Sequence, residues 1–438
     1  MVNRPGNRGK NVSNNRGVSF DRRTFLKASG ALGAAGLTGL AGCSGNGGDE
    51  TLTFGAIHLL SGFASVYGES AKLGYEMARE EINEDGGIDG QEIEPLIYRD
   101  SEGDGPTGIE AARSLVEEEN VDGLLGLDSS GVAQQVAPVA EQLQTPLMIT
   151  HAATPFVTAQ EGENAVGNDY VFRDGVNLSQ NVYGAAKVAE SLDSTSWTTV
   201  GPNYAFGTQS WDYFKAFTDG LDLGLEYLDD AAAFPELGAS DYTPHINKVL
   251  NEDPDGVVVS LWGSDVVTFI DQAQDTDFFD QVDDVLLTLG AATDALRPLE
   301  DNLPDGLWAG TRYWFETPDT ETNQTFVENF VEQNDQQPSY NAQNAYVALY
   351  LYKQAIESGG STDASDITSA FKGTTMDAPI GEFTINEESN QAVLPAVWGQ
   401  TSYSEDLEMS TLDPVERIDA PPETLRSLLE GSDYPAGV

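Results

Sequence analysis

The chain has 438 residues, with 72 acidic residues against 21 basic ones and a formal net charge of −51 at pH 7. This charge disfavours nucleic acid and anionic membrane surfaces as partners, because both repel it. Cys43 is the only cysteine, so disulfides within the chain, cysteine-based catalysis and thiolate metal sites are excluded too.

The first 42 residues predict an export signal. Arg22 and Arg23 precede a short apolar run, Ala28 to Ala41, a pattern typical of twin-arginine signals. The alternative is a poorly inserted membrane helix. It is disfavoured because the run has 14 residues, whereas about 20 are needed to span a bilayer.

The end of the signal predicts a lipid anchor. Leu40-Ala41-Gly42-Cys43 resembles the lipobox of lipoproteins. By that resemblance, Cys43 is lipid-modified and becomes the first mature residue, and residues 43–50 form a polar tether. We therefore expect the protein at the extracellular face of the cell membrane, attached by lipid alone.

Removal of the signal leaves 14 basic and 71 acidic residues, a net charge of −57. Aromatic residues and periodic apolar segments run throughout, which argues against disorder as the reason for this acidity. In molar salt the Debye length falls to about 3 Å and the self-repulsion is screened. The composition therefore favours a halophilic source.

Strands and helices alternate after the tether. The predicted strands are Leu52–Ile57, Glu92–Tyr98, Val121–Gly126 and Pro146–Thr150, and the helices are Val66–Glu84, Thr107–Glu119 and Val132–Leu143. This alternation is typical of a parallel sheet covered on both faces.

The pattern then restarts. Helices are predicted at Leu178–Ser191, Thr208–Gly220, Asn323–Gln333, Asn341–Glu357 and Asp366–Lys372, and strands at Trp197–Gly201, Leu225–Tyr227, Gly256–Leu261, Val285–Leu289 and within Asp377–Ser402. Two α/β lobes fit this length better than one very large sheet.

Several short motifs follow one another in a fixed order. They are Leu60-Ser61-Gly62, Tyr67-Gly68, Glu80-Glu81-Ile82-Asn83, Gly86-Gly87-Ile88-Asp89-Gly90, Gly126 to Gly131, Ala152 to Pro155, Asn203 to Gly207 and Tyr340 to Glu357. In this order the chain resembles the type I solute-binding proteins of ABC transporters, the branched-chain amino-acid and amide-binding family.

The resemblance implies an α/β fold of two doubly wound, Rossmann-like lobes joined by a three-strand hinge, the type I periplasmic binding protein fold. The expected crossings lie near Phe172–Val176, Trp308–Phe315 and Met376–Gly381. The first lobe then comprises residues 51–172 and 316–376, and the second comprises residues 173–315 and 377–438. In open α/β sheets, ligands bind at the carboxyl ends of the strands.

Candidate ligand residues of the first lobe follow predicted strands. Ser129 and Ser130 begin a helix, where backbone N–H groups and hydroxyls form a cradle for an anion or a carbonyl oxygen; plain N-capping is the alternative. The resemblance implies that Ala152, Ala153 and Thr154 contact the ammonium and carboxylate of a ligand, and an ordinary turn is the alternative. Tyr67 would lie against the ligand side chain.

The second lobe contributes aromatic candidates. Phe206 takes the place of a tyrosine in the cleft of relatives, with Tyr204 two residues earlier, and Trp262 follows a strand where relatives place another aromatic residue. For each of these side chains, and for Tyr67, packing in the hydrophobic core is the alternative.

One position departs from the family. Amino-acid-binding relatives neutralise the ligand's ammonium with a glutamate, and the matching residue here is Ala292. Asp294 or Asp265 could replace it, since a buried ammonium requires a partner. Otherwise the ligand lacks an α-ammonium, as an amide, a urea-type compound or a carboxylate would.

The histidines and two tripeptides give less information about function. His58, His151 and His245 are the only histidines and are too scattered for a typical metal site, so no metal or cofactor is expected. His151 adjoins the cleft loop, where contact with the ligand is the less favoured of two interpretations. Asn177-Leu178-Ser179 and Asn323-Gln324-Thr325 match the glycosylation pattern.

We expect a monomeric binding protein that captures a small polar solute and delivers it to an ABC permease. A sensor that presents its closed form to a membrane receptor is the alternative. An extracellular hydrolase is a third, disfavoured by the absence of a G-x-S-x-G or H-E-x-x-H motif.

Overall fold

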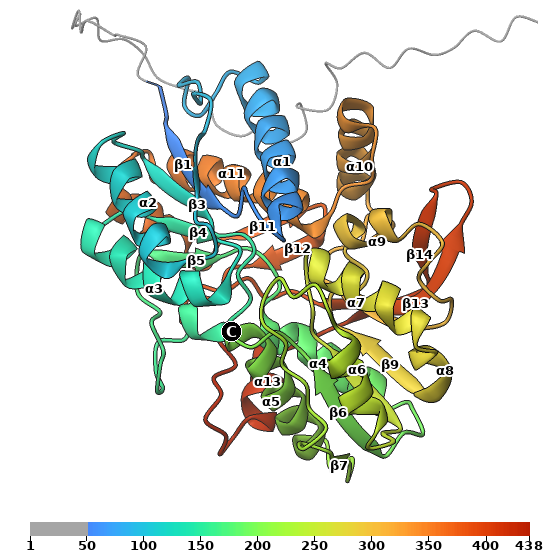
Figure 1. The fold of residues 1–438 in the computed structure, drawn as a ribbon. Coiled ribbons are helices and arrows are strands. Elements are labelled where there is room, and N and C mark those ends of the chain that lie inside the picture. Colours follow the sequence, from blue (N-terminus) through green and yellow to red (C-terminus); the bar gives the residue numbers. More distant parts are fainter. Residues whose placement is uncertain (1–50) are drawn as a thin grey trace, which may run out of the picture. The chain divides into compact units, whose positions relative to one another are not determined.

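The computed structural model describes residues 51–438. The export signal, Cys43 and the tether lie outside the described residues. Strands and helices alternate as the sequence predicts, and they form two large sheets and a short hairpin (Figure 1).

The first sheet has five parallel strands in the order β2-β1-β3-β4-β5. They are β1 (Phe54–His58), β2 (Ile97–Asp100), β3 (Gly123–Gly126), β4 (Leu147–Ile149) and β5 (Val171–Arg173). All except β2 are buried along their whole length. This burial on both faces explains why their sequences are continuous apolar runs.

Helices cover both faces of this sheet. They are α1 (Ser65–Glu84), α2 (Gly105–Glu117), α3 (Ser130–Leu143), α10 (Glu321–Asn334), α11 (Tyr340–Gly359) and α12 (Ala364–Phe371), with a short 3₁₀ helix at Pro155–Val157. Alternate residues of β3 serve opposite faces. Leu124 packs in a core with α2 and α3, while Leu125 packs in the core that includes α1 and α11. We call this sheet and its helices the first lobe.

The second sheet has seven strands in the order β14-β13-β10-β9-β8-β6-β7. They are β6 (Ser196–Val200), β7 (Glu226–Tyr227), β8 (Gly256–Val259), β9 (Asp284–Leu287), β10 (Trp308–Thr311), β13 (Ala396–Ser404) and β14 (Met409–Ile418). β6 to β10 are parallel, whereas β13 pairs antiparallel with β10 and β14.

The helices of this second lobe connect its strands. They are α4 (Leu178–Ala189), α5 (Ala205–Gly220), α6 (Thr243–Leu250), α7 (Ser264–Asp275), α8 (Phe278–Gln281), α9 (Thr293–Leu299) and α13 (Pro422–Leu428). α4 begins with a capping box, in which Asn177 accepts from the backbone of Gln180 and the Gln180 side chain accepts from the backbone of Asn177. Such a box fixes the point where the chain enters the helix after leaving the first lobe.

The chain passes between the lobes after β5, after β10 and before β13. The first two crossings lie where the sequence predicts them. At the third predicted position, β11 (Thr375–Ala378) and β12 (Gly381–Thr384) instead pair with each other as a hairpin. The following residues stay beside β5, because Arg173 N–H donates to the Asn390 carbonyl (3.0 Å) and Ala392 N–H to the Arg173 carbonyl (2.8 Å). The crossing therefore falls between Ala392 and Ala396.

Both tripeptides that match the glycosylation pattern are buried. The side chain of Asn177 caps α4, and the Nδ2 of Asn323 donates to the Phe315 carbonyl (3.0 Å). Neither amide is accessible in the folded protein. Over residues 51–438, no helix is long and apolar enough to cross a membrane.

Candidate functional site

A small cavity lies where the two lobes meet, and it has contributions from both. It is narrow, about 190 Å³ with its open side included, and it is lined by Asp128, Ser130, His151, Ala153, Tyr204, Phe206, Trp262, Leu289 and Arg312. Each of these residues follows a strand, namely β3, β4, β6, β8, β9 or β10. The cavity therefore lies at the carboxyl ends of both parallel sheets, where α/β proteins bind ligands.

Three helices begin at this cavity. Ser130 is the first residue of α3, Tyr204 is the N-cap of α5, and Trp262 lies two residues before α7. Neither Ser129 nor Tyr204 caps its helix with its side chain, so plain N-capping does not explain these residues. The N-terminus of a helix carries partial positive charge and free N–H groups, so this arrangement favours negative charge in the cavity.

A buried hydrogen-bond network lies on the first-lobe side. Asp128 Oδ1 is 2.9 Å from the Nδ1 atoms of both His58 and His151, and Asp128 Oδ2 accepts from Leu59 N–H (2.5 Å). His151 Nε2 is 2.8 Å from the Tyr340 hydroxyl. This network fixes the His151 ring beside the cavity.

Burial acts on the charges of this network. It opposes ionisation of Asp128, but the two histidines outweigh it and lower the pKa of the carboxyl. Burial lowers the pKa of His151 by more than the carboxylate of Asp128 raises it, so the net shift is downward. We therefore regard Asp128 as ionised and His151 as neutral at pH 7.

Arg312, directly after β10, is the most unusual residue of the cavity. It is 2% exposed, and its Nη1 donates to the His151 carbonyl (2.5 Å). Its guanidinium carbon lies 5.3 Å from the centre of the Tyr340 ring. Among the described residues, no carboxylate pairs with Arg312, and its Nε has no hydrogen-bond partner. Burial lowers the pKa of Arg312, as expected for a cation without a counterion.

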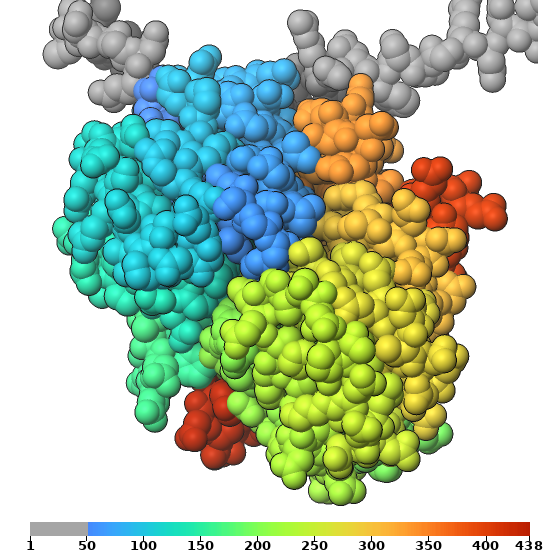
Figure 2. Space-filling model, viewed as in Figure 1, coloured from blue at the N-terminus to red at the C-terminus, as the bar shows by residue number. Residues whose placement is uncertain are grey.

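The lobes touch directly beside the cavity. Gly263 N–H, on the second lobe, donates to the Tyr67 hydroxyl (3.1 Å), and Ser264 N–H donates to the Phe63 carbonyl (3.0 Å). Trp262 stacks on Tyr67 at a centroid distance of 5.7 Å and meets Phe63 edge-on at 4.9 Å. On the face in Figure 2, the blue residues of the first lobe meet the yellow-green residues of the second without an open groove. On this face the contact between the lobes closes the way to the cavity, and separation of the lobes would open it.

Five predicted residues line the cavity together, namely Ser130, Ala153, Tyr204, Phe206 and Trp262, and His151 joins them. The other first-lobe candidates lie next to it. Tyr67 bridges the lobes, and Thr154 N–H donates to Ser130 Oγ (3.2 Å) while its own hydroxyl is buried without a partner. The Ala152 carbonyl accepts from Arg173 Nη1 (2.8 Å), and Ser129 precedes Ser130 as the N-cap of α3.

The two candidate partners for an ammonium do not line the cavity. Asp294 Oδ1 accepts from Arg297 Nη2 and Asp294 Oδ2 from Asn341 Nδ2, both at 2.9 Å. Asp265 Oδ2 accepts from Gly238 N–H (2.9 Å), and burial raises the pKa of this carboxyl to about 6. Ala292, at the family's glutamate position, is a buried N-cap of α9.

Sequence reasoning missed Arg312, Asp128, Leu289 and Tyr340. A usable signal existed for Arg312, because it stands inside the apolar stretch Trp308–Phe315 of a chain with few basic residues. Asp128 gave no such signal, since its role depends on His58 and His151, which come from two other strands.

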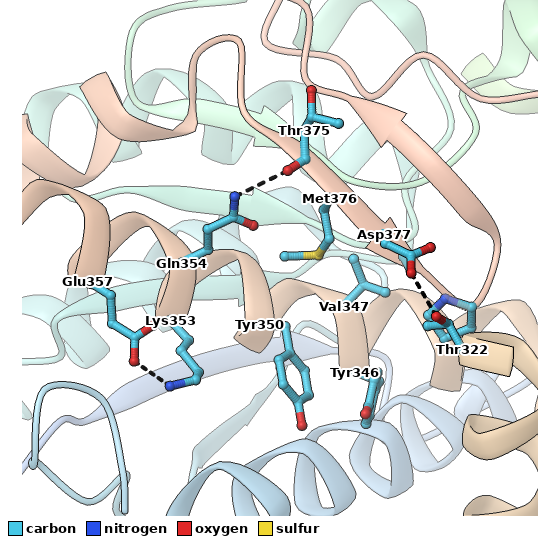
Figure 3. A pocket seen from close by; sticks show the side chains of 12 residues that line it. Thr322, Tyr346, Val347, Tyr350, Lys353, Gln354, Glu357, Thr375, Met376 and Asp377 are labelled. Carbon is cyan, nitrogen blue, oxygen red and sulfur yellow. Dashed lines mark hydrogen bonds and ion pairs between the residues drawn. The ribbon is translucent and has the colours of Figure 1, made fainter. Parts of the chain in front are cut away.

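A larger hollow lies elsewhere, entirely within the first lobe. This groove, about 800 Å³ with its open side included, is lined by Thr322, Tyr346, Val347, Tyr350, Lys353, Gln354, Glu357, Thr375, Met376, Asp377, Ala378 and Pro379 (Figure 3). Its polar groups are paired: Gln354 Nε2 donates to the Thr375 carbonyl (3.1 Å) and Thr322 Oγ1 to Asp377 Oδ2 (2.8 Å). None of the predicted ligand residues lies here.

Within residues 51–438, no group of three or more His, Cys, Asp or Glu residues could hold a metal ion. Two α/β lobes with a cavity at the facing strand ends define a hinged binding protein. Residues 51–404 match the family described as "Periplasmic binding protein". The chain belongs to this family, whose members are solute-binding proteins rather than enzymes.

Relatives and solved structures agree with this assignment. The chain is 26% identical over 352 residues to "Leu/Ile/Val-binding protein homolog 6" of Brucella suis, a match that covers 78% of this chain and 85% of the relative. An amino acid ABC transporter substrate-binding protein of Pseudomonas fluorescens matches with a TM-score of 0.74 at 20% identity, over 88% of this chain and 99% of that one.

Another solved structure contains a different class of ligand. A solute-binding protein of Rhodopseudomonas palustris in complex with 3,4-dihydroxybenzoic acid matches with a TM-score of 0.74 at 20% identity, over 85% of this chain and 99% of that one. These structures confirm the type I periplasmic binding protein fold. Residues 19–39 match the twin-arginine translocation signal, so the protein is exported.

Proposed function

We propose that this protein captures a small polar solute outside the cell, between two closing lobes, and delivers it to an ABC permease in the membrane. The observation that carries this proposal is the cavity itself. Both lobes contribute its walls, and nearly all of its lining is buried. A solute held there contacts both lobes at once, so binding stabilises the closed form that a permease recognises.

The two kinds of relative allow two kinds of solute. Curated relatives carry the name of Leu/Ile/Val-binding proteins, which supports a branched-chain or other amino acid. The dihydroxybenzoate complex shows that the same fold also accepts an acid without an α-ammonium. An amide-like compound is the third class, because Ala292 replaces the family's glutamate.

The function can be tested without knowing the solute. We would purify the protein from its own host, unfold it, and identify released small molecules by mass spectrometry. A strain that lacks the chain should then lose uptake of that solute. Unchanged uptake would contradict the transport role, and loss of a solute-dependent response with intact uptake would favour the sensor.

The anchor is a separate part of the proposal. Cys43 is the only residue of the chain that can carry a thioether-linked lipid, and the twin-arginine match ends just before it. Cys43→Ser should therefore release the protein from the membrane fraction into the medium. Retention of this variant in the membrane would contradict a lipid anchor at Cys43.

The charge and the oligomeric state complete the proposal. With 71 acidic residues in the mature chain, we propose a monomer that folds in molar salt and loses stability in dilute buffer, where self-repulsion is unscreened. Melting temperatures in a salt series, together with the mass in solution by light scattering, test both statements.

A further inference from the structure

The cavity holds a cation that the protein does not neutralise. Arg312 is 2% exposed and donates only one hydrogen bond among the described residues, from Nη1 to the His151 carbonyl. A peptide carbonyl is a dipole and does not cancel a full charge. Burying an unpaired cation is costly, so a structure that retains one at a cavity wall is suited to an anionic ligand.

Two further donors are found at the cavity or next to it. Arg312 Nε is buried without a hydrogen-bond partner among the described residues, and so is the hydroxyl of Thr154, which follows the lining residue Ala153. Trp262 Nε1 has only the hydroxyl of Tyr204 beside it. The helices α3, α5 and α7 direct their N-termini to the same place. Indole and guanidinium nitrogens cannot accept hydrogen bonds, so a matching ligand must bring acceptor oxygens.

The cavity offers little to an ammonium group. Asp128 is its only carboxylate, and it already accepts from His58, His151 and Leu59 N–H. The neighbouring backbone carbonyls are engaged as well: Ala152 accepts from Arg173 Nη1 and Ala153 from Leu178 N–H, both at 2.8 Å.

The two candidate carboxylates outside the cavity do not supply a partner for an ammonium group either. Asp294 bonds to Arg297 and Asn341, and Asp265 bonds to the Gly238 backbone. Ser130 and Tyr204 add hydroxyl groups, and the rest of the wall is apolar, from Phe206, Leu289 and Trp262. An amino acid would therefore bury its ammonium without a free carboxylate beside it.

From these contacts we infer that the solute is a small organic carboxylate with an apolar body and no α-ammonium, and that Arg312 binds its carboxylate. This inference rests on the proposed capture function and specifies its ligand class. The carboxylate would take hydrogen bonds from the guanidinium, and the body would pack against Trp262 and Phe206.

A set of matched compounds tests the ligand class. We would measure thermal shifts and affinities of the purified protein in molar salt with 4-methylpentanoate, leucine and 4-methylpentanamide, and with benzoate and benzamide. These compounds keep the body constant while the charged groups change. At least one acid should raise the melting temperature, its amide should not, and leucine should bind about tenfold or more weakly than 4-methylpentanoate.

Variants of Arg312 test whether this residue binds the carboxylate of the solute. Arg312→Gln should weaken acid binding by about 100-fold or more and should reduce the preference for acid over amide, an effect that a structural role alone does not produce. Arg297→Gln is the matched control, because Arg297 lies outside the cavity and pairs with Asp294. If Arg312→Gln does not fold, Arg312→Lys retains the charge and should lose about tenfold, since its ammonium lacks the fork geometry.

Three outcomes overturn the inference: leucine binds as tightly as 4-methylpentanoate, an amide binds as tightly as its acid, or neither acid binds. Acid binding that survives Arg312→Gln unchanged overturns the role of Arg312. The uptake test of the proposed function does not depend on the chemistry of the solute. Transport of an amino acid would therefore contradict the ligand class and leave the capture function standing.

Discussion

The cavity between the lobes and the groove within the first lobe differ in size and in chemistry. The groove is the larger of the two, but it is the poorer candidate for the ligand-binding site. The groove measures about 800 Å³ and the cavity about 190 Å³. In the groove, Thr322, Gln354 and Lys353 all have partners within it. In the cavity, Arg312 Nε is buried without a hydrogen-bond partner among the described residues.

The difference teaches that a buried, unpaired charge between two lobes marks a ligand site better than free space does. A native protein pairs its buried polar groups, so each exception calls for a reason. The groove is formed by α10, α11 and the β11–β12 hairpin, all on one lobe, and lobe closure does not create it. The cavity exists only when α3, α5 and α7 meet, which couples its occupation to closure.

Removing the aromatic wall of the cavity should produce the largest difference in affinity between a variant in the cavity and one in the groove. Trp262→Ala takes away a cavity wall and the contacts with Tyr67 and Phe63. We expect affinity for the solute to fall by about 30-fold, equivalent to about 2 kcal/mol. Tyr350→Ala in the groove is the matched control and should change affinity by less than about twofold. Calorimetric titration of both variants measures the two affinities. Similar losses of affinity would contradict the assignment of the ligand site to the cavity rather than to the groove.

The buried hydroxyl of Thr154 gives the next largest effect. If it donates to a ligand carboxylate, Thr154→Ala should weaken binding by about tenfold. The hydroxyl has no partner among residues 51–438, so its removal should leave the melting temperature of the ligand-free protein unchanged or slightly higher. A fall in that temperature with unchanged affinity would show that Thr154 serves the fold alone.

The hydrogen bond between the lobes offers a finer test. Tyr67→Phe removes the acceptor of Gly263 N–H, which stabilises only the closed form. A loss of about 1 kcal/mol, or about fivefold in affinity, is expected. Tyr346→Phe, which removes a bond to Glu81 beside the groove, should lower the melting temperature without changing affinity. The opposite pattern would mean that Tyr67 is a core residue.

Acidification should destabilise the region around the cavity through His151. Burial lowers its pKa below the ordinary 6.5, so below that pH the unfolded chain takes up a proton that the folded protein does not. Stability should therefore fall as the pH drops below about 6.5, by at most about 1.4 kcal/mol per pH unit for one proton, and His151 should contribute nothing above it.

The pH effect has its own control. His151→Gln should flatten the dependence of the melting temperature on pH between 6.5 and 5 more than His245→Gln, because His245 is only partly buried. Asp128 acts in a separate window, below its ordinary pKa of 3.8. Equal slopes in the two variants would contradict the role given to His151.

Local patterns predicted the parts of the site that follow a strand and open a helix. Ser130 was predictable in this way, because it follows a strand and begins a helix at the carboxyl edge of a parallel sheet. Tyr204 and Trp262 came instead from the resemblance to the solute-binding family. The two lobes and most elements followed from the same periodicity, with ends displaced by a few residues.

Partnerships between distant segments could not be predicted. Arg312 contacts the carbonyl of His151, 161 positions earlier, and the pairing of Asp294 with Asn341 is equally invisible in the sequence. The third crossing was placed too early for the same reason. Only the contact of Arg173 with Asn390 and Ala392 shows that the chain stays beside the first lobe after the hairpin.

The stacking of Trp262 on Tyr67 has an optical consequence. The indole is 3% exposed while the lobes touch, and separation of the lobes would expose it to water. Indole emission shifts to longer wavelength in a polar environment. Trp197, Trp211, Trp308 and Trp398 belong to strands or a helix of the second lobe, whereas Trp314 lies in the crossing after β10. The intrinsic fluorescence of the protein should therefore report opening and closing through Trp262, without any attached dye.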